Sequence, residues 1–234
     1  MSRLSPKNRT GLRRRISGGE GQHPDRLKML SDGVFSIALT LLIIDVVALG
    51  VHVNPGETLA HHLLHQWPTL VAYITGFMTI FVCWINNHRV FHYVNKIDSG
   101  LIWINGLQLA LVAAVPLPTA VLAAHLTGGE GQRTAFILYG ITYVLMAISF
   151  WSLSYYVDRR GLTDPSIDPD RYHGMLLIYR FSFVWTTLSL AVATVSVYSA
   201  IVMWTFMFAV FAFPAEFSHF MHLWSQWRAK VLDD

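Results

Sequence analysis

The sequence has few charged residues and almost no cysteine. Asp, Glu, Lys and Arg make up 13% of the 234 residues, whereas a soluble globular protein carries about 25%. The one cysteine, Cys83, excludes an intrachain disulfide and a cysteine-based metal cluster. The sequence also lacks Gly-x-Ser-x-Gly, His-Glu-x-x-His and phosphate-binding glycine-loop motifs, so it shows no hydrolytic machinery.

Long apolar stretches fill most of the chain instead. Hydrophobic residues make up 53% of the sequence, and a helix needs about 20 apolar residues to cross a bilayer. The pattern therefore predicts an all-α membrane protein with six transmembrane helices per chain. The expected spans are residues 29–49, 67–91, 101–126, 135–157, 175–198 and 199–219. The expected organisation is a disordered basic tail (1–25), one six-span domain (26–223) and a C-terminal tail (224–234).

Basic residues are distributed unevenly between the two sides of the membrane. Those from Arg3 to Lys28 precede the first span, and of the 17 Lys and Arg residues all but Arg133 fall on the same side as the N-terminus. The positive-inside rule makes that side cytoplasmic. We therefore expect both termini in the cytoplasm, and we attribute the net charge of +3 to this asymmetry rather than to nucleic-acid binding.

The third span contains Pro116 and Pro118, two residues apart. Proline lacks a backbone N–H and clashes with the preceding turn of a helix. We therefore expect a kink or an unwound turn here, with partners for the carbonyl groups that the prolines leave free.

The first span carries polar residues inside an apolar helix. Asp32, Ser36 and Thr40 recur at every fourth position and so share one helix face. A neighbouring apolar stripe is formed by Ile37, Leu41 and Ile44. Two interpretations stay open on this pattern alone. The polar face either joins helices together, as Ser and Thr commonly do in membranes, or lines a path for something polar.

Further polar residues gather at the cytoplasmic ends of the first three spans. Charged groups at that depth are normally paired. We therefore expect Asp32 to pair with Arg26 or His88, and Asn105 and the Trp103 indole to donate hydrogen bonds. The alternative is an ordinary collection of interfacial polar residues. The full predicted network is Arg26, Ser31, Asp32, His88, Trp103 and Asn105.

The chain has 11 histidines, several at helical spacing. Imidazole binds zinc, copper, iron and nickel, so these residues suggest a membrane enzyme with a metal or haem as an alternative function. The inner-side candidates for such a site are His88, His92, His219 and His222. The remaining cluster falls on the outer side, on a possible short amphipathic helix, where we expect an exposed interfacial surface without a metal. It consists of His61, His62 and His65.

Three motifs together resemble the lysosomal potassium channel family (transmembrane protein 175). The first is similar to the family signature Arg-x-x-x-Phe-Ser-Asp, with Leu30 in place of the Phe. The resemblance covers the first three spans, and the last three match in number and length only. The matching residues are Arg26, Ser31 and Asp32, then Trp84, Asn87, His88 and Phe91, then Asn105, Pro116, Pro118 and Thr119.

The resemblance implies a homotetramer in which the first span of each chain lines a central pore. It also implies that no carbonyl selectivity filter is present, and the sequence indeed lacks Thr-Val-Gly-Tyr-Gly. Ile37, Leu41 and Ile44 occupy the positions that form the family's constriction. Ser36 and Thr40 occupy positions where its selectivity has been placed.

These expectations amount to a potassium-permeable cation channel with a hydrophobic gate in a prokaryotic plasma membrane. The expected partners are K⁺ as the permeant ion, the lipid bilayer and three further copies of the chain. No enzyme activity, cofactor or catalytic residue is expected. A proton-conducting channel using His88 or Asp45 is the closest alternative.

Overall fold

The computed structural model describes residues 24–44, 46, 56, 58–166 and 169–212. The regular elements of this part of the chain are helices, joined by turns and loops, and an isolated β-bridge links Val94 and Thr163. Outside it lie most of the predicted N-terminal tail, all of the C-terminal tail, Asp45, His219 and His222. The helices are α2 (Asp25–Leu41), α4 (Leu59–His65), α5 (Trp67–Tyr93), α6 (Ser99–Ala114), α7 (Pro116–His125), α8 (Gln132–Arg159), α9 (Pro169–Ala193) and α10 (Val197–Ala212).

Four stretches of helix are long and apolar enough to cross a bilayer: 67–93, 99–125, 132–159 and 172–193. They match the second to fifth predicted spans. The first and last spans are represented by shorter helices within the described residues, since α2 has 17 residues and α10 has 16. The chain is thus an all-helical, multi-pass membrane protein, while six full crossings remain a prediction.

The helix starts follow from local hydrogen bonds at their first turns. Thr58 precedes α4, and its Oγ1 accepts a hydrogen bond from the His61 N–H at 3.4 Å. Asp98 precedes α6 and accepts from the Leu101 N–H at 2.9 Å. Both are residue types that satisfy the free N–H groups of a first turn. The short helix expected between the first two spans is therefore present.

The two prolines interrupt the third span at one residue. Val115 lies between α6 and α7 and keeps right-handed helical angles, with φ −54° and ψ −37°. Its N–H donates to the Val112 carbonyl, one residue short of the normal α-helical partner. The hydroxyl of Thr119 donates to the Val115 carbonyl at 2.8 Å. The prolines therefore cause a local interruption rather than an unwound segment.

The boundary between the last two helices differs from the prediction. It was expected near residues 198–199, but α9 ends at Ala193 and a turn follows over residues 194–196. Thr194 donates its hydroxyl proton to the Ala191 carbonyl at 2.7 Å. Ser196 Oγ accepts from the Ser199 N–H at 3.4 Å in the first turn of α10. Hydrogen bonds from hydroxyl groups to the nearby backbone therefore determine where α9 ends and α10 begins. In a sequence, Ser and Thr indicate a helix boundary less strongly than glycine or proline does.

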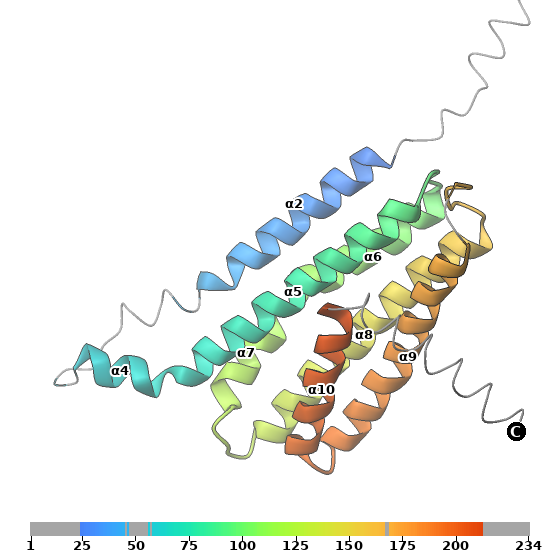
Figure 1. Ribbon diagram of the computed structural model, residues 1–234. Coiled ribbons are helices and arrows are strands. Elements are labelled where there is room, and N and C mark those ends of the chain that lie inside the picture. Colours follow the sequence, from blue (N-terminus) through green and yellow to red (C-terminus); the bar gives the residue numbers. More distant parts are fainter. Residues whose placement is uncertain (1–23, 45, 47–55, 57, 167–168, 213–234) are drawn as a thin grey trace, which may run out of the picture.

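The helices form an elongated bundle with α2 along one edge (Figure 1). Helix α2 packs on α5 and α6, and α8 packs on both α6 and α9. At one end of the bundle the loop after α5 meets the loop after α8. There the Asn95 N–H donates to the Leu162 carbonyl at 2.9 Å, and the Asp164 N–H donates to the Tyr93 carbonyl at 2.9 Å.

Asp98 stabilises the same end of the bundle. Its second carboxylate oxygen accepts a hydrogen bond from the Tyr156 hydroxyl of α8 at 2.8 Å. Burial alone would raise the pKa of Asp98. The hydrogen bonds from Leu101 and Tyr156 and the charge of Arg160 outweigh that effect and lower the pKa below its usual value. The carboxylate that caps α6 is therefore held in its charged form.

Candidate functional site

Helix α2 has one buried face and one open face. The side chains of Leu27, Ser31, Phe35, Ala38 and Leu42 are buried. Their spacing of three or four residues follows one side of a helix. This side packs on α5 and α6. The rotation of α2 about its own axis is therefore fixed within the chain.

The opposite side of α2 carries the residues predicted for the pore. Ile37 is 61% exposed, Leu41 44% and Ile44 58%. Ser36 and Thr40 are also exposed. Ser36, Ile37, Thr40 and Leu41 thus share the open face of α2, and the exposed Ile44 lies three residues beyond the end of this helix at Leu41. Helix α2 itself lies at the edge of the chain (Figure 1). A contiguous open face of this kind marks a surface that contacts lipid, another subunit or a solute path.

The two hydroxyl groups on this face donate their protons to their own helix. Ser36 Oγ donates to the Asp32 carbonyl at 2.7 Å, and Thr40 Oγ1 donates to the Ile37 carbonyl at 2.9 Å. A hydroxyl group has one proton and two acceptor lone pairs. With the proton used inside the helix, the oxygen lone pairs remain for a cation or for water.

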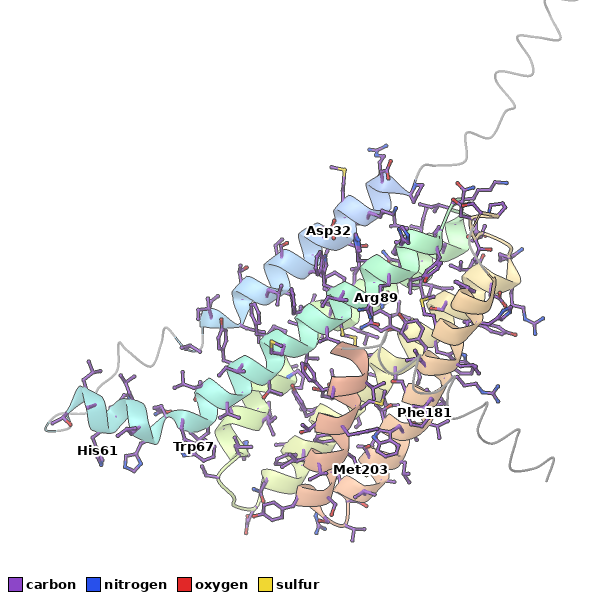
Figure 2. All side chains as sticks on the ribbon, in the orientation of Figure 1. Asp32, His61, Trp67, Arg89, Phe181 and Met203 are labelled. Carbon is purple, nitrogen blue, oxygen red and sulfur yellow. The ribbon has the colours of Figure 1, made fainter. Side chains whose placement is uncertain are left out.

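Asp32 is held by a residue that was not in the predicted network. The Trp84 indole of α5 donates to Asp32 Oδ1 at 2.8 Å, whereas Arg26 or His88 was the expected partner. His88 instead lies against the Trp84 ring, with centroids 5.8 Å apart and the ring planes tilted by 32°. Figure 2 labels Asp32 on the side of α2 near α5. The Trp103 side chain, another expected member, is 80% exposed in the single chain.

A buried chain of hydrogen bonds joins α2, α5 and α6. Asn105 Nδ2 donates to Ser31 Oγ at 3.1 Å, and Ser31 in turn donates to the Leu27 carbonyl at 2.9 Å. Asn87 Nδ2 donates to Asn105 Oδ1 and to Gln108 Oε1, each at 3.1 Å. We refer to the residues Ser31, Asn87, Asn105 and Gln108 as the polar seam. Their side chains are all buried.

The structure thus brings Ser31 and Asn105 together and adds Asn87 and Gln108 to them. Sequence reasoning did not include Gln108 in the network. A signal for it exists, because Gln108 lies three residues after Asn105 and so shares its helix face inside an otherwise apolar stretch. The sequence indicated Trp84 as the partner of Asp32 less clearly. Which of the nearby indole and cationic donors reaches Asp32 depends on how α2 and α5 pack.

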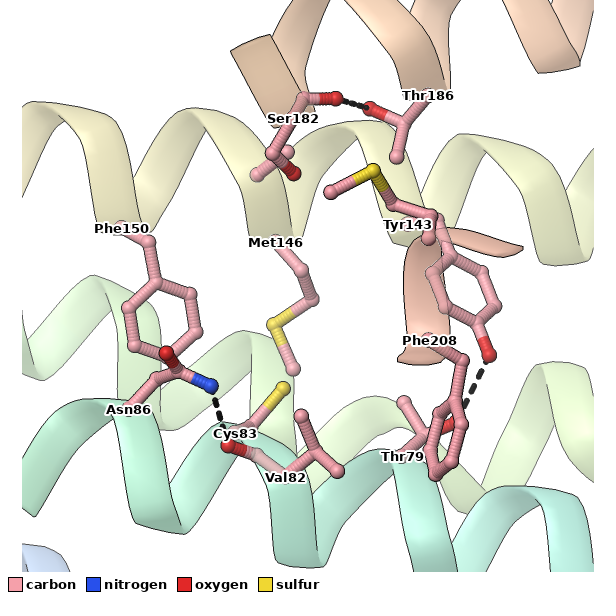
Figure 3. Close-up of a pocket in the computed structure, with 12 residues that line it drawn as sticks. Thr79, Val82, Cys83, Asn86, Tyr143, Met146, Phe150, Ser182, Thr186 and Phe208 are labelled. Carbon is pink, nitrogen blue, oxygen red and sulfur yellow. Dashed lines mark hydrogen bonds between the residues drawn. The ribbon is translucent and has the colours of Figure 1, made fainter. Parts of the chain in front are cut away.

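A cavity of about 50 Å³ lies elsewhere in the bundle, between α5, α8, α9 and α10 (Figure 3). Thr79 and Tyr143 face each other beside it, with their hydroxyl oxygens 2.8 Å apart. Cys83 and Met146 line its middle. No residue of α2 lines this cavity, so the cavity is separate from the face that carries the predicted pore residues.

Comparison with known proteins supports the motif resemblance over a larger part of the chain. A family model described as the endosomal/lysosomal potassium channel TMEM175 matches residues 26–116. A protein of Streptomyces collinus named as a potassium channel is 42% identical over 144 residues, which cover 61% of this chain and 69% of that protein. An endosomal/lysosomal proton channel TMEM175 of Gallus gallus is 34% identical over 100 residues, covering 40% of this chain and 20% of that protein.

A solved structure extends the similarity to the fold. The crystal structure of a lysosomal potassium-selective channel TMEM175 homolog from Chamaesiphon minutus matches with a TM-score of 0.67 and 30% sequence identity. The match covers 83% of this chain and 97% of that chain. It therefore covers a larger part of the chain than the first three spans, to which the motif resemblance was limited.

The alternative of a metal or haem enzyme is wrong, because the family and the relatives are ion channels. For the same reason no cofactor is expected. Of the four histidines proposed for that enzyme, His88 and His92 are the two within the described residues. The described residues also contain no group of three or more His, Cys, Asp or Glu side chains that could hold a metal. The chain is a membrane cation channel and belongs to the TMEM175 family.

Proposed function

We propose that this protein is a potassium-permeable channel in which four copies of α2 surround a central pore. The observation that carries the proposal is the open face of α2, where Ile37 and Leu41 lie beside Ser36 and Thr40, with the exposed Ile44 just beyond the end of the helix. In a four-fold assembly each of these residues forms a ring. The proposed channel domain spans residues 26–223, with tails over 1–25 and 224–234, and each chain crosses the membrane six times.

The rings would control ions in two ways. Apolar rings close a pore by steric contact and by dewetting. The hydroxyl oxygens of Ser36 and Thr40 would replace part of the hydration shell of a cation, since their protons already bond the helix backbone. K⁺ loses its hydration shell more readily than Na⁺. We therefore propose modest preference for K⁺ rather than the strong discrimination of a carbonyl filter.

The polar network would be structural rather than ion-conducting. Ser31 and Asn105 are buried in the polar seam, and Asp32 is bonded to Trp84. Arg26 begins the same helix, and we assign it to the same supporting role together with His88 and Trp103. We propose a prokaryotic plasma membrane, because relatives named as potassium channels come from bacteria. We also propose that both termini lie in the cytoplasm, because the predicted spans put almost all basic residues on the side of the termini.

The test is K⁺ flux into liposomes that contain the purified protein, with a protonophore present, for the wild type and for Ile37→Asn. An amide at Ile37 would wet the constriction, so we expect flux to rise about tenfold or more, since a dewetting barrier of 1.4 kcal/mol corresponds to a factor of ten. Replacing K⁺ by Na⁺ should lower flux through the wild type.

A matched control lies on α5. Ile74 is 59% exposed, close to the 61% of Ile37, so Ile74→Asn makes the same chemical change outside the proposed pore. Flux through that variant should equal the wild type. Equal effects of the two substitutions, or no effect of Ile37→Asn in protein confirmed as a tetramer, would remove Ile37 from the gate.

Proton conduction is the second candidate, because the vertebrate relative is named as a proton channel. His88 would be a relay group, since its ring is exposed and lies against Trp84, which bonds Asp32. Asp45, the other predicted relay, lies outside the described residues. Reversal potentials that follow the pH gradient rather than the K⁺ gradient, and that lose this dependence in His88→Gln, would favour this function.

A further inference from the structure

Two histidines on α4 present their ring nitrogens to each other. The Nε2 atoms of His61 and His65 lie 3.1 Å apart, and the ring centroids are 4.3 Å apart. The two residues are four positions apart, which brings side chains onto one face of a helix. Both rings are exposed. The proposed pore and the resemblance to known channels leave this pair without a role.

We propose that His61 and His65 chelate a divalent transition-metal ion, with Cu²⁺ as the best fit. Imidazole nitrogen binds such ions at about 2.0–2.1 Å. Two bonds of that length to atoms 3.1 Å apart enclose an angle of about 100°. This value lies between the square-planar and tetrahedral angles, so the pair already spans two neighbouring coordination positions.

The choice of Cu²⁺ follows from the donor atoms. Affinity for nitrogen donors rises along the first-row divalent ions to a maximum at copper. A hydrogen bond between the two Nε2 atoms needs a proton on one of them, whereas metal binding requires both Nε2 atoms to be unprotonated. With two ligands from the protein, the remaining coordination positions are open to water. The proposed site is thus an accessible chelating site rather than a closed structural one.

The helix that carries the pair has a fixed orientation. Thr58 caps the first turn of α4, and His62, between the two ligands in sequence, is buried. The buried ring on one side keeps His61 and His65 on the open side. Figure 2 shows His61 on the short helix next to Trp67, at the end of the molecule opposite the start of α2. In the proposed topology this end faces the outside.

A second histidine pair provides an internal comparison. His88 and His92 on α5 have the same four-residue spacing and are also exposed. Their rings contact other aromatic residues instead: the His88 ring lies 5.8 Å from the Trp84 ring in a tilted arrangement, and His92 meets Tyr93 edge to face at 5.9 Å. Because the ring nitrogens of His61 and His65 face each other, we expect this pair to bind Cu²⁺ more tightly than His88 and His92.

The test is Cu²⁺ titration of the tag-free full-length protein in detergent, followed by calorimetry and electron paramagnetic resonance. We expect one tightest Cu²⁺ per chain, with hyperfine splitting from two nitrogens. His61→Gln or His65→Gln should each weaken that binding about tenfold or more, because each removes half of a chelate. The double variant should bind Cu²⁺ no more tightly than either single variant.

His92→Gln is the matched control and should leave the tightest Cu²⁺ site unchanged. Gel filtration and thermal unfolding without metal verify that each variant is folded, and exposed His→Gln changes are not expected to alter either. Unchanged Cu²⁺ affinity in His61→Gln and His65→Gln would overturn the proposal. An equal loss in His92→Gln would overturn it too. Because binding is measured without ion flux, the outcome is independent of the proposed channel function.

Discussion

The two sides of the helix bundle are held together by different interactions. On one side, the polar seam and the Trp84–Asp32 hydrogen bond join α2 to α5 and α6. On the other side, Trp204 of α10 stacks on two rings of α8, Phe136 at 6.1 Å and Tyr143 at 5.9 Å. Helix α10 also packs on α9, where the Trp185 ring lies 5.0 Å from the Phe206 ring and its indole donates to the Met203 carbonyl at 3.0 Å. The proposed pore helix thus belongs to the polar side of the molecule.

This difference has a physical consequence for how the helices are oriented. A hydrogen bond requires a donor and an acceptor in register, so the bonds of Ser31 and Asp32 allow one rotation of α2. Ring stacking and apolar contact tolerate larger shifts between helices. We infer that the polar side determines which face of α2 is presented, whereas the aromatic side provides a scaffold.

The largest expected effect comes from breaking the polar seam. Asn105→Ala removes the donor to Ser31 and an acceptor of Asn87, both buried. Unsatisfied buried groups cost about 1–3 kcal/mol each, so we expect the free energy of unfolding to fall by about 2–3 kcal/mol in total. Denaturant titration of the protein in detergent measures this change.

The control for that variant is a buried polar residue on the other side. Ser189 is buried, and its hydroxyl donates to the Trp185 carbonyl within the same helix. Ser189→Ala should cost about 1 kcal/mol or less, because no contact between helices is lost. An equal cost of both substitutions would contradict the special role of the polar seam.

A smaller effect is expected from overpacking the aromatic side. A Cβ atom on Gly140 would lie 2.8 Å from a Trp204 ring carbon and 2.9 Å from a Leu190 methyl carbon. Gly140→Ala should therefore lower the free energy of unfolding by about 1–2 kcal/mol. Gly106→Ala is the comparison, since a Cβ there meets no atom within 4 Å. It should leave stability unchanged or raise it, and a loss as large as that of Gly140→Ala would refute the packing argument.

The smallest effect is expected at the Trp84 indole. Trp84→Phe keeps an aromatic ring but removes the donor to Asp32, which is an exposed carboxylate. A hydrogen bond to an exposed charge contributes about 1 kcal/mol or less. The control is Trp67→Phe, because the Trp67 side chain is 49% exposed and lies at the far end of α5 from Asp32, so this variant should change nothing measurable. Thermal unfolding of both variants in detergent measures their midpoint temperatures. If the two midpoints shift equally, the hydrogen bond from Trp84 to Asp32 does not stabilise the fold.

The sequence by itself determined the class of molecule and the positions of most helices. Apolar run lengths gave the second to fourth spans to within three residues at each end, because a helix in lipid must satisfy its backbone within its own segment. The motif from Arg26 to Asp32 gave the family. Helical spacing placed Ile37, Leu41 and Ile44 on one face, since the 3.6-residue period is a local property.

Only the tertiary structure decided which polar groups meet. Trp84 and Asp32 are 52 residues apart in the chain. From the sequence alone, other hydrogen-bond donors were equally good candidates for the partner of Asp32. Gln108 joined the polar seam because α5 packs where its amide can reach Asn87 at 3.1 Å. The turn after α9 is likewise formed by hydrogen bonds of hydroxyl groups, and these residue types do not mark a helix boundary strongly in the sequence. Partner choice follows from helix crossing and rotation, which are set by packing across the whole bundle rather than by any single stretch of sequence.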